Sequence, residues 1–129
     1  MKVAQTPARI LIADDSSSFR SILKKRIETH SAYWKVCGEA AEGVETVRKA
    51  MALKPDLAII DLQMPMMDGL SASSRIAKSL PALPILICTI HKSGYLDKEA
   101  RKAGIRQVIS KSNLEALLKA LEDLLGKTQ

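Results

Sequence analysis

Residues 57–69 read Leu-Ala-Ile-Ile-Asp-Leu-Gln-Met-Pro-Met-Met-Asp-Gly, and this stretch decides the fold. The four apolar residues 57–60 are typical of a strand that is buried on both faces. Asp61 ends this run, and the proline, aspartate and glycine within residues 65–69 indicate a turn before a segment of helical periodicity. The stretch therefore predicts a strand, a loop that begins with a carboxylate, and a helix.

The same unit of strand followed by helix recurs on both sides of this stretch. Three other strand-like runs also end in polar residues: 10–13 leads into Asp14 and Asp15, 85–88 into Thr89, and 108–110 into Lys111. A fifth run covers Trp34 to Glu39. Apolar strands that alternate with amphipathic helices indicate a parallel sheet covered on both faces, with right-handed crossovers. We predict one three-layer α/β domain over residues 1–129.

The predicted elements can be placed along the whole chain. The strands are expected at about residues 9–14, 34–39, 57–61, 85–89 and 107–110, and the helices at about residues 17–29, 43–53, 69–80, 94–103 and 113–125. Ile22 and Val44 are expected on the inward faces of the first two helices. The fourth helix has the thinnest apolar stripe and is expected to be loosely held.

Composition and targeting signals narrow the class of protein. The chain has 129 residues, of which 47% are hydrophobic and 26% charged, as in soluble globular domains. No apolar run approaches the roughly 20 residues of a membrane helix, and residues 1–7 lack the apolar segment of a secretory signal. We therefore expect a cytoplasmic protein in which Cys37 and Cys88 are buried, reduced thiols.

The formal charge of +6 makes an acidic partner worth considering. The basic residues cluster at 24–26, 48–49 and 98–106, each on a helical segment whose outer face would be charged in any case. The chain carries no zinc-finger spacing and no aromatic RNA-binding motif. This pattern favours a solvated surface, without direct nucleic-acid binding by this domain.

The polar residues at the strand ends have a joint chemical meaning. Carboxyl ends of parallel strands meet at one edge of the sheet, so Asp14, Asp15 and Asp61 are expected to be neighbours. Two carboxylates about 4 Å apart repel by roughly 4 kcal/mol at an effective dielectric of 20, and a divalent cation resolves this repulsion. Oxygen ligands suit Mg²⁺, and the absence of a nearby His or Cys ligand argues against zinc.

Asp61 can also act as a nucleophile on phosphorus, which gives an aspartyl phosphate. Transfer of a phosphoryl group depends mainly on positioning and on neutralising the charge of its oxygens. Thr89 is suited to hydrogen-bond one of these oxygens, and Lys111 to offset the charge on another. Taken singly each residue has a plainer reading, such as helix capping by paired acids. Their joint occurrence in this order predicts phosphoryl chemistry.

With these residues, the chain resembles the receiver domain of bacterial two-component response regulators over nearly its whole length. The resemblance is carried by Asp14-Asp15, by residues 61–69, by Thr89 and by Lys111. It implies a doubly wound, flavodoxin-like (βα)5 fold with a five-stranded parallel sheet in the order 2-1-3-4-5. It also implies a phosphoacceptor switch that at most catalyses its own phosphorylation and dephosphorylation.

The resemblance assigns a role to each site residue. Asp61 would accept a phosphoryl group from a histidine kinase or phosphotransfer protein, and Thr89 and Lys111 would contact that group. The metal is expected to be Mg²⁺, and its ligands would be Asp14, Asp15, Asp61 and the backbone carbonyl of Gln63. Movement of Thr89 would then alter the surface formed by the fourth and fifth strands and helices, and a homodimer on phosphorylation is one expected response.

One further residue that matches the family bears on what the switch would control. His91 lies two residues beyond Thr89, as in a branch of receivers joined to helix-turn-helix domains. A DNA-binding effector beyond Gln129 in the native gene, and an output in transcription, follow as expectations from that branch.

Three positions depart from the family pattern. Ser112 stands where the family usually has a proline after the lysine, and because a cis bond before a non-proline residue costs about 3 to 4 kcal/mol, we expect a trans bond or a rearranged loop. Val108 replaces the aromatic switch residue, and Ile90 replaces a small residue and is expected to restrict access to Asp61. These departures motivate a second reading, a receiver-like interaction module that does not depend on phosphorylation.

Two readings from other classes fit the sequence less well. A flavodoxin-like nucleotide or flavin binder would place phosphate beside the acids of the first strand, and Ser16-Ser17-Ser18 is not a glycine-rich cradle. A hydrolase with Asp61 as its nucleophile would need a substrate-binding cap, for which the five repeats leave no room.

Overall fold

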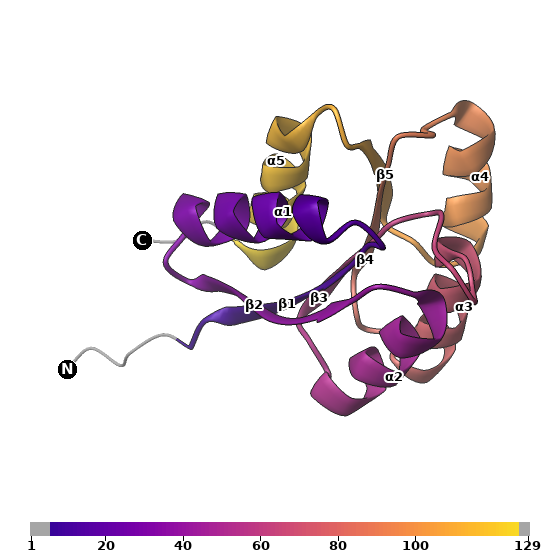
Figure 1. The fold of residues 1–129 in the computed structure, drawn as a ribbon, viewed down its shortest axis with the longest axis horizontal. Coiled ribbons are helices and arrows are strands. Elements are labelled where there is room, and N and C mark those ends of the chain that lie inside the picture. Colours follow the sequence, from indigo (N-terminus) through magenta and orange to yellow (C-terminus); the bar gives the residue numbers. More distant parts are fainter. Residues whose placement is uncertain (1–5, 127–129) are drawn as a thin grey trace.

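The computed structural model describes residues 6–126, which form five strands and five helices in strict alternation (Figure 1). These elements are β1 (Ala8–Ala13), α1 (Ser17–His30), β2 (Trp34–Ala40), α2 (Gly43–Leu53), β3 (Leu57–Ile60), α3 (Gly69–Ser79), β4 (Ile85–Thr89), α4 (Gly94–Lys102), β5 (Gln107–Ser110) and α5 (Leu114–Leu125). Each element begins and ends within one residue of its predicted position. Most of the N-terminal segment used to argue against a secretory signal, residues 1–5, lies outside the described residues.

The strands form one parallel sheet in the order β2-β1-β3-β4-β5, which confirms the predicted fold class and strand order. From β1 the chain first moves outward to β2 and then returns past β1 to β3. The carboxyl edge between β1 and β3 is therefore the topological switch point, where α/β sheets of this kind bind their ligands.

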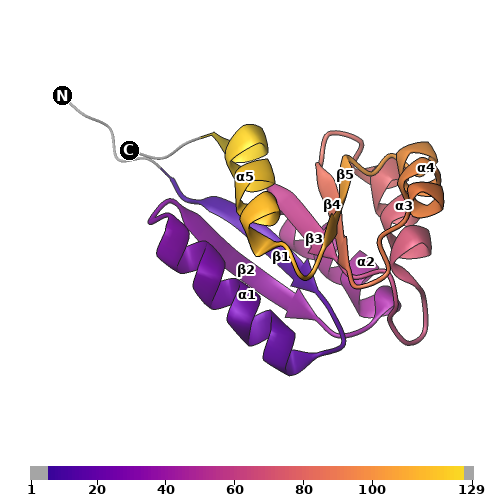
Figure 2. The ribbon, with the colours of Figure 1, turned by 90° about the horizontal axis from the view of Figure 1, so that it is seen from above.

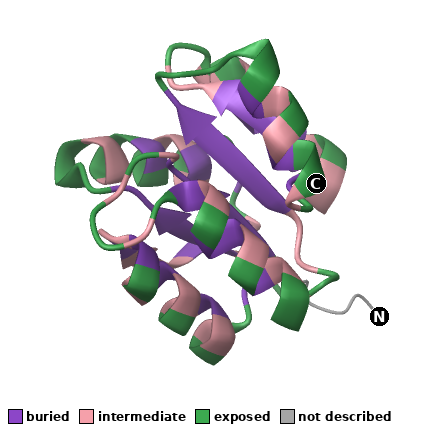
Figure 3. Cartoon of the chain, turned by 90° about the vertical axis from the view of Figure 1, so that its right-hand side faces the viewer, coloured by how far each residue is buried: buried purple, intermediate pink, exposed green. Residues whose placement is uncertain are grey.

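The helices cover both faces of the sheet. α1 and α5 lie on one face and α2, α3 and α4 on the other, as the two views of the ribbon show (Figures 1 and 2). Successive strand residues point to opposite faces, so Ile10 and Ile12 pack under α1 and α5 whereas Leu11 and Ala13 pack toward α2, α3 and α4. The central strands β3 and β4 are buried throughout, and Figure 3 shows the buried strands between the two helical layers.

The expectation that Ile22 and Val44 face inward is wrong. Ile22 is 54% exposed and Val44 is 47% exposed. In α1 the residues that contact the core are Phe19, Leu23 and Ile27, four residues apart, so the inner stripe is too narrow to include Ile22. In α2 the buried positions are the small or polar residues Gly43, Thr46 and Ala50, and at Gly43 the helix packs closely against Met67 of the loop after β3.

Both cysteines are free thiols, as predicted, although only Cys88 is fully buried. Cys37 is partly exposed because β2 is an edge strand of the sheet. Among the described helices, none is long and apolar enough to cross a membrane.

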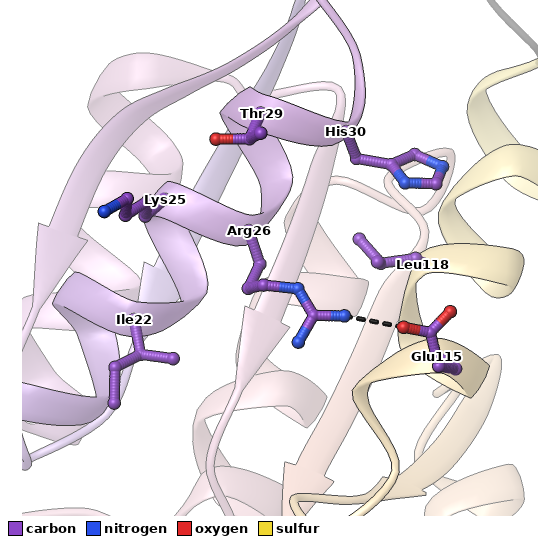
Figure 4. Close-up of a pocket in the computed structure, with 7 residues that line it drawn as sticks. All are labelled: Ile22, Lys25, Arg26, Thr29, His30, Glu115 and Leu118. Carbon is purple, nitrogen blue, oxygen red and sulfur yellow. Dashed lines mark hydrogen bonds and ion pairs between the residues drawn. The ribbon is translucent and has the colours of Figure 1, made fainter.

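Two polar contacts between side chains join α1 to α5. Arg26 lies 2.7 Å from Glu115, across a groove that Figure 4 shows between the two helices. His30 lies 3.1 Å from Glu122, and its ring stacks on Trp34 with the ring centroids 5.3 Å apart. Exposed pairs of this kind contribute at most about 1 kcal/mol each, so the apolar packing beneath them holds the layer together.

Gly69 should be intolerant of a side chain, because a Cβ there would lie 2.1 Å from the carbonyl oxygen of Asp61. We expect Gly69→Ala to lower the free energy of unfolding by about 2 kcal/mol or more, measured by urea denaturation. Gly94→Ala is the matched control, because a Cβ at this first position of α4 meets no atom within 4 Å. Its effect should stay within about 0.5 kcal/mol. Equal effects of the two substitutions would contradict the close packing at Gly69.

Candidate functional site

Three carboxylates meet at the switch point of the sheet, as predicted. Asp14 and Asp15 follow β1 and Asp61 follows β3, and one oxygen from each lies within 4.8 Å of the others. The register of the sheet causes this proximity, because Ala13 is paired with Ile60 and the next residue of each strand therefore lies beside the other.

The backbone holds the two inner acids in place. The N–H of Asp14 donates to the carbonyl of Ala40 at 2.9 Å, and the N–H of Asp61 donates to the carbonyl of Ala13 at 2.8 Å, so both acids continue the strand ladders. Asp14 is 2% exposed and Asp61 7%, whereas Asp15 is exposed. Asp14 and Asp61 therefore lie at the buried bottom of the cluster, and Asp15 lies at its opening to solvent.

Each inner carboxylate also accepts a backbone hydrogen bond. Oδ1 of Asp14 accepts from the N–H of Ser16 at 2.8 Å, and Oδ1 of Asp61 accepts from the N–H of Leu62 at 2.8 Å. The other oxygen of each acid, Oδ2, faces Lys111. These contacts fix both carboxylate planes.

Lys111 joins the site from the loop after β5, as predicted. Its ammonium lies 2.6 Å from Oδ2 of Asp14 and 3.3 Å from Oδ2 of Asp61. Its backbone N–H donates to the carbonyl of Thr89 at 3.0 Å, which anchors the loop to β4. One partly buried cation thus offsets part of the charge of two buried carboxylates.

The electrostatics follow from burial and from this pairing. Burial, together with the charge of Asp14, raises the pKa of Asp61, and Lys111 only partly opposes the rise. Burial alone would lower the pKa of Lys111, but its hydrogen bond to Asp14 and the charges of both acids raise that pKa overall. Burial raises the pKa of Cys88 to about 12, so this thiol stays protonated and unreactive.

The remaining predicted site residues lie at the same edge without joining the cluster directly. Thr89 ends β4 and is fully buried, and its hydroxyl oxygen accepts from the N–H of His91 at 3.2 Å. Gln63 lies in the exposed turn two residues beyond Asp61. Its backbone carbonyl as a metal ligand stays a prediction.

The family-specific segment 61–69 forms a tight loop. The N–H of Gly69 donates to the carbonyl of Leu62 at 2.7 Å, and the carboxylate of Asp68 caps α3 by accepting from Ser71 at 2.8 Å. Met66 takes a left-handed conformation with φ 71°. The loop therefore sets the exit direction of the chain from Asp61 into α3.

The loop at Ser112 is held by serine hydroxyls. The Oγ atoms of Ser110 and Ser112 lie 2.8 Å apart, and the N–H of Ser112 donates to Oγ of Ser110 at 3.2 Å. No cis peptide bond occurs among residues 6–126, which confirms the expected trans bond before Ser112. Ile90 is 72% exposed, so its side chain points largely to solvent, and its effect on access to Asp61 remains a prediction.

Two residues near the site were not singled out from the sequence. The guanidinium of Arg20 donates to the main-chain oxygen of Asp14 at 2.6 Å and pairs with Glu39 at 2.9 Å. The ring of Phe19 lies under the ammonium of Lys111, 4.4 Å from it. Both residues follow Asp14 and Asp15 by less than two helical turns, and this closeness to the acids was the feature of the sequence that could have identified them.

The donor set fits a hard divalent cation. All three candidate ligands offer carboxylate oxygen, and they lie close enough together to share one ion. Mg²⁺ prefers such ligands with water in its remaining positions, and the exposed Asp15 leaves the mouth open to water.

Fold and site together define a flavodoxin-like α/β protein with a carboxylate cluster and a lysine at the carboxyl edge of its sheet. The family model described as "Response regulator receiver domain" matches residues 10–122. The chain therefore belongs to the response regulator receiver family.

Individual relatives agree with this assignment. Chemotaxis protein CheY of Thermotoga maritima is 39% identical over 103 residues, which are 80% of this chain and 84% of CheY. A protein-glutamate methylesterase/protein-glutamine glutaminase of Myxococcus xanthus is 38% identical over 106 residues, 81% of this chain but only 30% of that protein. The crystal structure of a LuxR-family response regulator from Aurantimonas superposes with a TM-score of 0.87 at 30% identity, over 93% of this chain and 86% of that one.

The raised pKa of Asp61 has a consequence for stability. The folded protein holds this proton more tightly than the unfolded chain, so the contribution of Asp61 is present below its ordinary pKa of about 4 and is lost as pH rises through its folded pKa. Asp61→Asn should therefore raise the free energy of unfolding at pH 7, with a gain that shrinks toward pH 4 in urea titrations. Asp68→Asn is the control, because Asn caps a helix as well as Asp does. No gain for Asp61→Asn at pH 7 would contradict the electrostatic account.

Proposed function

We propose that this chain is a phosphorylation-dependent signalling switch in which Asp61 accepts a phosphoryl group from a histidine kinase or phosphotransfer protein. The observation that carries the proposal is the set of contacts around Asp61, a buried carboxylate beside Asp14 and Asp15 whose Oδ2 faces the ammonium of Lys111. Membership of the receiver family supports the same chemistry.

The site residues divide the reaction between them. A carboxylate oxygen of Asp61 attacks phosphorus, and the bond from phosphorus to the donor nitrogen breaks with its electron pair leaving on that nitrogen. Lys111 then offsets charge on one phosphoryl oxygen and the hydroxyl of Thr89 donates to another. Asp14, Asp15, Asp61 and the carbonyl of Gln63 would hold Mg²⁺, which would neutralise the remaining oxygen charge. At most, the domain catalyses its own phosphorylation and dephosphorylation.

Thr89 connects this chemistry to the surface. Its hydroxyl oxygen accepts from the N–H of His91, so a move of Thr89 toward a phosphoryl group would break that bond and release the loop before α4. α4 buries only Leu96 and Ala100, whereas α5 buries four residues. We therefore propose that α4 and the adjoining surface of β5 and α5 carry the signal outward.

We further propose the wider setting of this switch. Residues 1–129 would act as one receiver domain in the cytoplasm, form a homodimer on phosphorylation, and control transcription through a DNA-binding effector in the native protein. The resemblance to a LuxR-family regulator supports that effector. In this proposal the effector domain contacts DNA and the receiver domain does not.

A second candidate function is an interaction module that works without phosphate. It is favoured by Val108, a buried residue of β5 at the position where the family pattern has an aromatic switch residue. The complete set of acids with Lys111 favours the phosphorylated switch instead.

Phosphoryl labelling tests the first proposal. With Mg²⁺ and a small phosphodonor, the wild-type protein should gain an acid-stable, base-labile phosphoryl group, and Asp61→Ala should abolish labelling because the nucleophile is lost. Radiolabel retention after denaturing electrophoresis measures this. Asp68→Asn, on the exposed cap of α3, should label normally. A base-labile phosphoryl group that persists in Asp61→Ala would refute the assignment.

Amide NMR spectra distinguish the two candidate functions. Beryllofluoride with Mg²⁺ should shift the amide resonances of residues 89–110 in the wild-type protein, because Thr89 moves toward the bound analogue. Thr89→Ala should bind the analogue with much smaller shifts in α4. Unchanged wild-type spectra would favour the phosphate-independent module.

A further inference from the structure

The position of Phe19 is not used by the proposed reaction. Phe19 lies in the first turn of α1, and its N–H donates to Oγ of the cap residue Ser16 at 3.1 Å. Its ring lies beneath the ammonium of Lys111, with 4.4 Å between the nitrogen and the ring centroid. An ammonium over an aromatic face at this distance is attracted by the electrons of the ring.

The contacts around Phe19 form a closed circuit. Ser16 donates its N–H to Asp14, Phe19 donates its N–H to Ser16, the Phe19 ring lies under Lys111, and Lys111 pairs with Asp14. The start of α1 and the loop after β5 are far apart in sequence, and this circuit fixes them relative to each other. The hydrogen bonds of Ser16 therefore position both the Phe19 ring and the Asp14 carboxylate.

The partners of Lys111 differ in what they do during the proposed reaction. Asp14 and Asp61 are the groups that the divalent cation and the phosphoryl group would engage, so both contacts of the ammonium with carboxylate change. The ring of Phe19 carries no formal charge and binds no metal. Its contact with Lys111 therefore requires neither a free carboxylate nor a metal ion.

We propose that Phe19 is a positioning residue that holds the ammonium of Lys111 over the site, aimed at the phosphoryl oxygen, once the carboxylates are engaged elsewhere. This inference rests on the proposed function of the site. The side chain of Lys111 is only 16% exposed, and little water competes with the ring for the cation.

Phe19 also packs against the core under α1 and α5, so its two roles must be separated. Phe19→Leu keeps an apolar side chain but removes the aromatic face. Phe19→Tyr keeps the face. A packing role predicts that Leu is tolerated, whereas the positioning role predicts that only an aromatic residue serves.

The first experiment uses the ligand-free protein. With ¹³C-labelled lysine, the protons on Cε of Lys111 should show an upfield ring-current shift in wild type and in Phe19→Tyr, and this shift should vanish in Phe19→Leu. Lys111→Met identifies the resonance. An upfield shift of these protons that persists in Phe19→Leu would overturn the placement of the ring.

The second experiment titrates beryllofluoride at saturating Mg²⁺. Phe19→Leu should weaken binding about 2- to 30-fold, the range from an exposed to a desolvated cation on an aromatic face, and Phe19→Tyr should bind as wild type does. Equal affinity of Phe19→Leu and wild type, or equal weakening in both variants, would overturn the proposal. Failure of the wild-type protein to bind would instead refute the proposed function, and the Lys111 shift would still decide whether the ring holds the ammonium.

Discussion

The repulsion between Asp14 and Asp61 is the constraint on which the site depends. Both carboxylates are nearly inaccessible to water, and neighbouring parallel strands force them together. Burial of like charges is unfavourable unless a cation accompanies them. Lys111 is that cation, and it reaches the pair from the loop after the edge strand β5. The carboxyl edge of the sheet therefore carries an excess of negative charge, which a divalent metal ion would neutralise.

The surrounding structure maintains this arrangement by close packing and short hydrogen bonds. Gly69 and Gly43 allow the loop after Asp61 to approach the backbone more closely than any side chain would permit. Arg20 holds the main chain of Asp14, and the hydroxyls of Ser110 and Ser112 close the turn around Lys111. Asp14, Asp61 and Lys111 are thus each supported by a contact outside the cluster, so the placement of these three residues does not depend on a ligand.

Much of the fold and the site could be predicted because the informative features are local. The run at residues 57–60 and the acid after it specify a buried parallel strand with a carboxylate at its end, and the same holds for the acids after β1 and for Lys111. The inward faces of the helices were harder, because whether Ile22 is covered depends on how closely α5 approaches α1. Arg20 and Phe19 were not identified as site residues for a similar reason, since their partners lie on other elements, and the periodicity of α1 marks Phe19 only as a residue that packs on the core. The fold follows from patterns along the sequence, whereas the support of the site depends on contacts between residues on different elements.

The two helical layers are anchored unequally, and this bears on how the protein behaves at rest. α5 buries four residues, and the side-chain contacts of Glu115 and Glu122 with α1 brace it further, whereas α4 buries only Leu96 and Ala100. A two-state element held by so little apolar contact has a small free-energy gap between its arrangements, so its minor arrangement is populated without any ligand. A shift of that population then requires only a modest difference in affinity. In the proposed switch, α4 would therefore adopt its active arrangement in part of the unphosphorylated molecules, and phosphorylation would raise that fraction in degree.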